Sequence, residues 1–248
     1  MKPRQLAGAV MAVTVFHVAS AAEIKVLSAG AVEPGLKAVA SAFQKESGHE
    51  LKLTFNTAPQ IRKRIGDGEV QDVVIAPPAL IDELSKSGKL APQRADVGRV
   101  GMGVAVRPGA PVPDILSTDA LKKSVLDADS IVYNRASSGL YFEGLLKKMG
   151  VYDQVEKKTT RYADGAAVMD HVLKGKGREI GFGPITEILQ HRDRGLKLVG
   201  PLPAEVQNYT SYAAGIMDGA SSRAAAQDFV RYLGTPAAKK VFVAAGIE

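Results

Sequence analysis

Cysteine and tryptophan are both absent from the 248-residue chain, and aromatic residues make up only 6% of it. Without cysteine there can be no disulfide bond, thiolate metal site, catalytic thiol or lipid-modified cysteine. The scarcity of aromatic side chains argues against a nucleic-acid-binding surface, which would stack bases on them. The formal net charge is +6, with lysine and arginine scattered along the chain. This mild basic balance suits a small anionic ligand.

Recognisable enzyme motifs are also missing. The chain has no Gly-x-Ser-x-Gly nucleophile elbow, no phosphate-binding P-loop and no His-Glu-x-x-His zinc motif. His49, His171 and His191 lie far apart in the sequence, and no pair of carboxylates stands out in an apolar setting. We therefore expect no catalytic residue, cofactor or metal ion, and a secreted enzyme is the weaker alternative.

The N-terminus has the three-part pattern of a secretory signal peptide. Lys2 and Arg4 precede an almost wholly apolar run over residues 6–18, and small residues follow at 19–22. The apolar run is shorter than the roughly 20 residues that a membrane-spanning helix needs. The sequence predicts a signal peptide over residues 1–22 and export of a soluble protein to the periplasm.

Strands and helices are predicted to alternate along the rest of the chain. Leu36, Val39, Ala40 and Phe43 recur at the spacing of a helix face, and Gly48 follows as a stop signal. By such patterns strands are predicted at 24–28, 51–55, 72–75, 100–106, 131–133, 180–182 and 196–199. Helices are predicted at 34–47, 59–65, 80–84, 118–125, 138–149, 166–173 and 185–191, with two more within 222–246, split at 234–236.

This alternation indicates an α/β fold in which helices flank a mostly parallel sheet. No single linker rich in proline, glycine or serine divides the chain. We therefore expect two intertwined lobes, joined by crossovers near 101–106 and 209–215. Lobe I would comprise residues 23–103 and 213–248, and lobe II residues 104–212.

Three loops between a strand and a helix carry small or hydroxyl residues: 28–31, 56–59 and 135–139. The first amides of a helix have no internal acceptor, and the helix dipole is positive at that end. An anion is stabilised there without a charged side chain, and small residues let it approach the backbone. Helix capping alone would also explain each loop. Because such loops gather at the carboxyl ends of the strands, the three together predict an anion-binding cleft.

At these residues the sequence resembles the periplasmic molybdate-binding protein family of ABC importers, which has the type II solute-binding fold. The resemblance extends over nearly the whole chain after the signal peptide, and its most telling stretches are residues 24–30, 55–62, 71–76, 136–142 and 179–187. It implies a two-lobed monomeric receptor without enzymatic activity. Such a receptor captures a small molybdate-like oxyanion between its lobes and delivers it to an inner-membrane permease.

Three positions depart from the family's molybdate binders. Ala31 stands where those proteins have a serine, Thr57 is the one hydroxyl kept in the second loop, and Pro184 replaces a typical tyrosine. A small organic carboxylate therefore stays open as an alternative ligand, for which a bidentate guanidinium from Arg62 or Arg135 would be suited unless these are plain surface charges. The full set of candidate ligand-binding residues is Ser28, Ala29, Gly30, Ala31, Thr57, Ala58, Arg62, Arg135, Ser137, Ser138, Gly139, Pro184 and Ile185.

The position of the small residues predicts where the exported protein begins. Cleavage after Ala21 or Ala22 would leave Ala22 or Glu23 as the first residue. N-terminal sequencing of protein recovered from the periplasm measures this directly. A periplasmic protein that keeps Lys2 and Arg4 would contradict the prediction.

Overall fold

The computed structural model describes residues 21–248, and residues 1–20 of the predicted signal peptide lie outside that range. Within it, no helix combines the length and apolar character needed to cross a bilayer. The strands are β1 (Glu23–Ala29), β2 (Glu50–Asn56), β3 (Val73–Ala76), β4 (Leu90–Val106), β5 (Ser130–Asn134), β6 (Thr159–Tyr162), β7 (Glu179–Pro184), β8 (Lys197–Pro201) and β9 (Tyr209–Met217). The α-helices are α1 (Glu33–Ser47), α2 (Ala58–Gly66), α3 (Pro78–Lys86), α4 (Thr118–Asp127), α5 (Ser137–Lys148), α6 (Tyr152–Val155), α7 (Gly165–Lys174), α8 (Ile185–Gln190), α9 (Arg223–Leu233) and α10 (Pro236–Ala244). Short 3-10 helices are η1 (Gly30–Val32), η2 (Glu156–Lys158), η3 (Arg192–Arg194) and η4 (Ala204–Val206).

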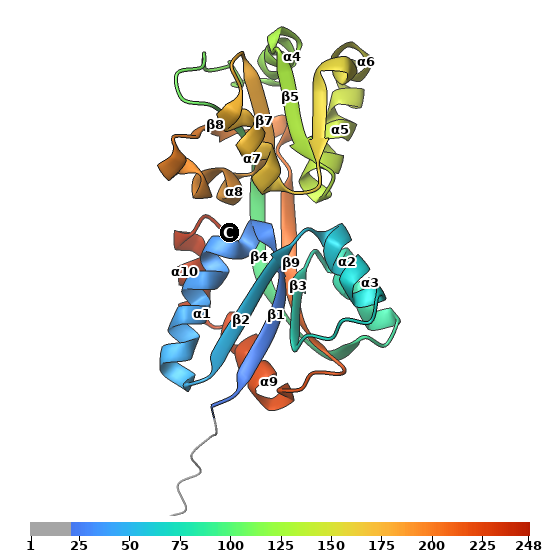
Figure 1. The fold of residues 1–248 in the computed structure, drawn as a ribbon, viewed down its shortest axis with the longest axis vertical. Helices are drawn as coiled ribbons and strands as arrows, with labels where there is room; N and C mark the ends of the chain where they lie inside the picture. The colour runs from blue at the N-terminus through green and yellow to red at the C-terminus, as the bar shows by residue number, and fades with distance from the viewer. Residues whose placement is uncertain (1–20) are drawn as a thin grey trace, which may run out of the picture.

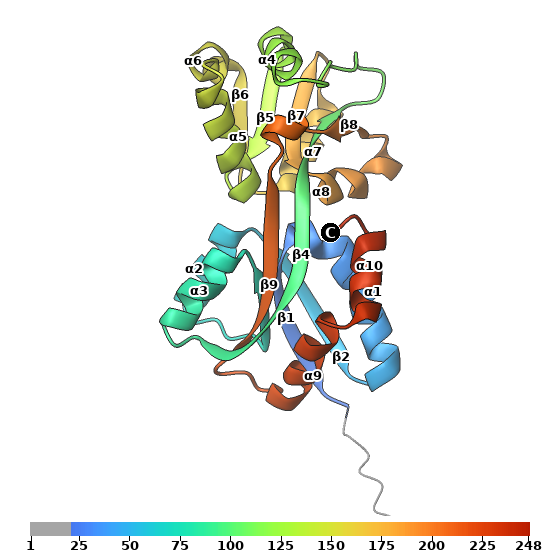
Figure 2. The same cartoon turned by 180° about the vertical axis from the view of Figure 1, so that it is seen from behind.

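The strands form two sheets, one in each half of the molecule (Figures 1 and 2). They run in the order β2-β1-β3-β9-β4-β7-β5-β6, and β8 also pairs with β4. Parallel pairing joins β1 to β2 and β3, and β5 to β6 and β7. Every antiparallel pair involves β4 or β9. The antiparallel pairing in both sheets therefore comes from these two strands, whereas the strand–helix units pair in parallel.

The two lobes are connected through β4 and the segment that leads into β9. β4 pairs with β9 as far as Gly101, and its continuation from Met102 pairs with β7 in the other sheet. Gln207, just before β9, fastens this point. Its side chain accepts a hydrogen bond from the Met102 amide at 3.0 Å and donates one to the Met102 carbonyl at 3.0 Å. Both connecting segments therefore lie side by side where the chain passes between lobes (Figure 2).

Helices cover both faces of each sheet, because successive buried side chains of a strand point to opposite faces. In lobe I, Val73 and Ile75 pack against α1, α9 and α10, whereas Val74 packs against α2 and α3. In lobe II, Ile131 packs against α4, α5 and α6, whereas Val132 packs against α7 and α8. Each lobe therefore has a hydrophobic core above and below its sheet.

The sequence-based predictions missed three features of this fold. One is the strand β9, because only a crossover between the lobes was predicted at 209–215. The strand predicted at 100–106 begins ten residues earlier, at Leu90. Its first half alternates partly buried and exposed residues around charged side chains and contains Pro92, so it lacks the apolar run that marks a buried strand. The elements α6 and β6 were not predicted either. β6 is an edge strand whose residues, Thr159–Tyr162, are mostly polar and only partly buried.

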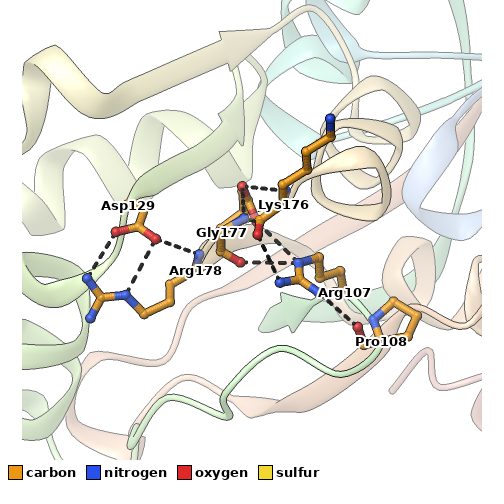
Figure 3. Close-up of polar contacts among 7 residues, drawn as sticks. Arg107, Pro108, Asp129, Lys176, Gly177 and Arg178 are labelled. Atoms are coloured by element: carbon orange, nitrogen blue, oxygen red, sulfur yellow. Dashed lines mark hydrogen bonds and ion pairs between the residues drawn. The ribbon is translucent and has the colours of Figure 1, made fainter.

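Two arginines secure the turn between α7 and β7 at the far end of lobe II (Figure 3). Arg107, which follows β4, donates to the carbonyls of Lys176 and Gly177 at 3.2 and 3.1 Å. Arg178 forms an ion pair with Asp129, which precedes β5, at 2.9 Å. The turn is thereby joined to both neighbouring strands, so this end of the sheet is braced by polar contacts.

The core of lobe II supports a stability prediction. Phe142 is fully buried on α5 and stacks on Phe182 of β7 with ring centroids 3.8 Å apart. Phe142→Ala should lower the free energy of unfolding by about 3–5 kcal/mol, because it leaves a cavity where a ring was packed. Leu140→Ala, on the same helix but 56% exposed, is the matched control and should change it by less than about 0.5 kcal/mol. Urea unfolding of the three proteins tests this, and equal losses for both variants would contradict it.

Candidate ligand-binding cleft

The carboxyl ends of several strands from both lobes lie at the boundary between the lobes, and a helix begins just after each of these strands (Figure 1). β1 leads into η1 and α1, and β2 into α2, in lobe I. β5 leads into α5, β6 into α7 and β7 into α8 in lobe II. Ligands of open α/β sheets bind at such carboxyl ends, where helix N-termini present free amides. The fold therefore directs several helix starts into one interlobe space.

Two adjoining cavities occupy this space. The larger, of about 250 Å³, is lined by Gly30, Glu33, Phe55, Asn56, Thr57, Gln60, Asp164, Gly165, Ala166, Glu187, Gln190 and His191. The smaller, of about 30 Å³, is lined by Ala29, Gly30, Ala31, Asn56, Thr57, Ala58, Pro77, Asn134, Ala136, Ser137, Ser138, Pro184, Glu187 and Tyr212. Four residues belong to both: Gly30, Asn56, Thr57 and Glu187. The cavities are thus two parts of one cleft, and neither lining includes a lysine or an arginine.

The loop before α5 is held by Asn134 at the end of β5. Its Oδ1 atom accepts hydrogen bonds from the amides of Ala136 at 2.9 Å and Gly139 at 3.2 Å, and its Nδ2 donates to Ser138 Oγ at 3.2 Å. A Cβ atom at Gly139 would lie 1.7 Å from the Asn134 carbonyl oxygen. Gly139 therefore lets the loop close on Asn134, and its amide is already occupied.

The loop before α2 is held by a capping contact. Thr57 donates its amide to Gln60 Oε1 at 2.8 Å and its hydroxyl to the same oxygen at 3.0 Å. Asn56 turns its side-chain oxygen toward Arg64, which also pairs with Glu69. These contacts fix the polar side chains that line both cavities on the lobe I side.

Eight of the thirteen candidate residues line the smaller cavity: Ala29, Gly30, Ala31, Thr57, Ala58, Ser137, Ser138 and Pro184. Ser28 is fully buried and bonds to the Ala29 carbonyl. Ile185 packs toward Gly103 in the body of lobe II. Arg62 forms a bidentate ion pair with Glu83 on the outer surface, and Arg135 is exposed. Neither of these two arginines lines either cavity.

Glu187, in the first turn of α8, is the acidic group that both cavities share. The residue is partly buried, but its Oε2 atom is enclosed and has no hydrogen-bond partner among the described residues. Burial, with the charges of Asp164 and Glu33, raises the pKa of this carboxyl from 4.5 to about 7. Burial and the nearby Glu187 charge also raise the pKa of Tyr212. Near neutral pH the cleft therefore holds a carboxyl that can gain or lose a proton.

The other two acids of the larger cavity have partners. Glu33 pairs with Lys37 at 2.5 Å, one turn along α1. Asp164 caps α7 by accepting a hydrogen bond from the Ala167 amide at 2.9 Å. Helix amides and a lysine thus offset these two charges. Glu187 lies in the first turn of α8, but its Oε2 atom accepts no hydrogen bond from the described residues.

The lobes also touch directly beside the cleft. Thr186 of α8 is fully buried and donates its hydroxyl to the Ala31 carbonyl of η1 at 2.6 Å. α8 of lobe II therefore lies against the start of α1 in lobe I (Figure 1). This contact holds Glu187, the next residue, at the boundary between the lobes.

The sequence-based predictions did not single out Glu187, Asp164, Gly165 or His191. A usable signal existed for Glu187, because it follows a predicted strand in the same way as the three loops that were chosen. No such signal existed for Asp164 and Gly165, because the strand before them, β6, was not recognised. Arrangements of three or more His, Cys, Asp or Glu side chains suited to a metal ion do not occur in residues 21–248.

The burial of Glu187 predicts a pH dependence of stability. Its raised pKa means that folding favours the protonated form, so this stabilisation is complete below about pH 4.5 and is lost as the pH rises through about 7. Glu187→Gln cannot ionise. Between about pH 5.5 and about pH 8, the free energy of unfolding of the wild type should fall by about 1–2 kcal/mol relative to that variant.

Urea unfolding at both pH values measures the difference. Glu83→Gln is the control, since Glu83 is exposed and its pKa is lowered by Arg62. A wild type and a Glu187→Gln variant that respond identically to pH would show that Glu187 is not buried in the way described.

Comparison with known proteins accords with this architecture. Residues 24–248 match the family model for bacterial extracellular solute-binding proteins. The chain is 29% identical to an aconitate isomerase of Pseudomonas sp over 91% of this chain and 87% of that protein. It is 23% identical to the molybdate-binding protein ModA of Haemophilus influenzae over 93% and 92%.

The periplasmic molybdate-binding protein of Azotobacter vinelandii superposes with a TM-score of 0.76 at 18% identity, covering 91% of this chain and 98% of that one. This likeness confirms the predicted two-lobed type II fold. The predicted resemblance to molybdate-binding proteins is also confirmed, as that of a divergent member. The chain belongs to the family of bacterial extracellular solute-binding proteins.

Proposed function

We propose that this protein is a periplasmic receptor that captures a small organic acid with more than one carboxylate and delivers it to an ABC importer. One observation carries the proposal: a small cavity at the helix starts adjoins a larger one and shares four lining residues with it. A carboxylate held in the first would leave the carbon skeleton and the remaining carboxylates in the second.

The volumes favour this ligand over a single tetrahedral oxyanion. The smaller cavity, about 30 Å³, is much the tighter of the two. A carboxylate group has three non-hydrogen atoms, whereas a tetrahedral oxyanion has five. The larger cavity, about 250 Å³, would stay unfilled with an oxyanion alone.

The donors in the cleft are neutral. Ser137 and Ser138 contribute hydroxyls and amides at the start of α5, which can bind a carboxylate without a guanidinium. The sequence suggested Arg62 or Arg135 as a carboxylate-binding residue. Arg62 is instead paired with Glu83 outside the cleft, and neither arginine lines a cavity. The similarity to an aconitate isomerase supports a tricarboxylate as the ligand class.

A molybdate-like oxyanion is the second candidate. The similarity to molybdate-binding proteins favours it, and so does the absence of cationic side chains from the lining. Such an ion would occupy the smaller cavity alone, after the lobes adjust around it.

Three further proposals accompany the receptor function. The protein acts as a monomer, is exported by cleavage of residues 1–22, and moves the lobe that contains β1, β2, β3 and β9 against the lobe that contains β5, β6, β7 and β8. A ligand that touches both lobes stabilises the closed arrangement by its greater affinity for it. The contacts between Met102 and Gln207 support a hinge at the crossover.

Calorimetry on the purified protein distinguishes the two candidates. Molybdate, tungstate and sulfate are compared with mono-, di- and tricarboxylates, including citrate and both isomers of aconitate. We expect a di- or tricarboxylate to bind. Ser137→Ala should weaken binding by about 0.5–1.5 kcal/mol, the usual contribution of one hydrogen bond.

Three variants serve as controls in that experiment. Ser85→Ala makes the same chemical change on the exposed face of α3, and Arg62→Ala and Arg135→Ala remove the arginines outside the cleft. All three should bind as the wild type does. Binding of an oxyanion with no response to any carboxylate would replace the first candidate by the second, and a strong loss in Arg62→Ala or Arg135→Ala would contradict the neutral-donor site.

A further inference from the structure

The position of Glu187 suits a side chain that reacts with a bound ligand and does more than line the cleft. Glu187 lines both cavities, and its enclosed Oε2 atom has no partner among the described residues. An unpartnered buried carboxyl costs stability, because neither hydrogen bonds nor an ion pair offset its desolvation. A site that only bound anions would be better served by an amide or a hydroxyl at this position.

Two glycines make room for this carboxylate. A Cβ atom at Gly165, the first residue of α7, would lie 1.7 Å from Glu187 Oε2, and one at Gly30 would lie 3.2 Å from Oε1. Neither glycine has a positive φ, so the backbone itself does not require glycine at either place. The space they leave is occupied by the Glu187 carboxylate, which is thus seated between loops of both lobes.

We propose that Glu187 is a catalytic acid–base residue that moves a proton between two carbon atoms of a bound unsaturated polycarboxylate. The proposal rests on the proposed carboxylate ligand. The substrate class is an acid with a CH₂ group next to a carbon–carbon double bond that bears a carboxylate.

The reaction needs no other reactant. The Glu187 carboxylate takes a proton from the CH₂ carbon, and the electron pair of that C–H bond becomes the new carbon–carbon double bond. The electrons of the old double bond spread onto the conjugated carboxylate and then accept the proton at the far carbon. One C–H bond is broken and one is formed, the double bond moves by one position, and Glu187 ends as it began.

The cleft supplies what this transfer requires. Negative charge develops on the substrate carboxylate in the intermediate, and helix-start amides around the smaller cavity stabilise charge at that point. A base works best when its pKa is near the working pH. Burial, with the charges of Asp164 and Glu33, brings the pKa of Glu187 to about 7. The other titratable groups that face the cleft are Tyr212 and His191, whose Nδ1 lies 3.0 Å from the Glu187 carbonyl oxygen.

The test follows cis- and trans-aconitate with the full-length exported protein, by proton NMR in D₂O and by calorimetry. The wild type should bind the acid and interconvert its isomers. Glu187→Gln should bind within about threefold but lose turnover by at least about 100-fold, the usual effect of removing a general base. Gly165→Ala, which pushes the carboxylate from its seat, should lower turnover by up to about 100-fold while binding is kept.

A control and a pH profile exclude purely structural explanations. Glu83→Gln makes the same change on the outer surface and should leave turnover unchanged. Wild-type kcat/KM should rise with pH through about 7, because it reports the ionisation of Glu187 in the free protein, and His191→Gln should leave that midpoint in place.

Each failure has a distinct meaning. If the wild type binds aconitate or another polycarboxylate but aconitate is neither interconverted nor deuterated, the catalytic proposal is overturned and the receptor function stands. If Glu187→Gln keeps its turnover, another group is the base and the assignment is wrong. If no carboxylate binds, the proposed ligand class fails, and this inference fails with it.

Discussion

The pairing of β4 with β9 is the constraint on which the remaining structure depends. β4 contributes to both sheets, and the chain returns through β9 beside it, so the two lobes share a backbone connection on one side only. The sheets are therefore set end to end, with the carboxyl ends of their parallel strands facing each other. Helices that begin there must present their free amides to the same space. An interlobe cleft lined by helix starts is thus a consequence of the topology, and the side chains decide what it holds.

Much of this arrangement could be predicted from sequence because it depends on periodicity. The helix over Leu36 to Phe43 carries the spacing of a helix face, and the strand over Ile24 to Ser28 is a largely apolar run of strand length. The elements that escaped prediction are those stabilised by their neighbours. β6 is a short edge strand, and the first half of β4 is held by pairing along β9. Their residues satisfy backbone hydrogen bonds without forming a continuous apolar segment, so the local sequence carries little signal.

The candidate site shows the same division between local and distant causes. Residues such as Thr57 and Ser138 were predicted to lie at the cleft because the rule for helix starts is local, and they line it. The role of Arg62 depends on Glu83, which lies 21 residues away and removes the guanidinium from consideration for the ligand. Glu187 and Gly165 meet only in the folded protein, from two different helix starts. No property of either segment alone predicts a carboxylate enclosed at the boundary between lobes.

Binding and proton transfer are closely related in such a cleft. An anion bound next to Glu187 repels its ionised form, so ligand charge and the protonation of Glu187 are thermodynamically linked. Closure of the lobes would remove more water and raise the pKa of this carboxyl further, which also makes the ionised form a stronger base. For a ligand whose C–H bonds are all inert, this linkage only makes capture pH-dependent. For a ligand with an acidic C–H bond beside the carboxylate, the same geometry brings a base to the reacting carbon. The difference between a receptor and an isomerase on this fold would then depend on the ligand's chemistry as much as on the protein's.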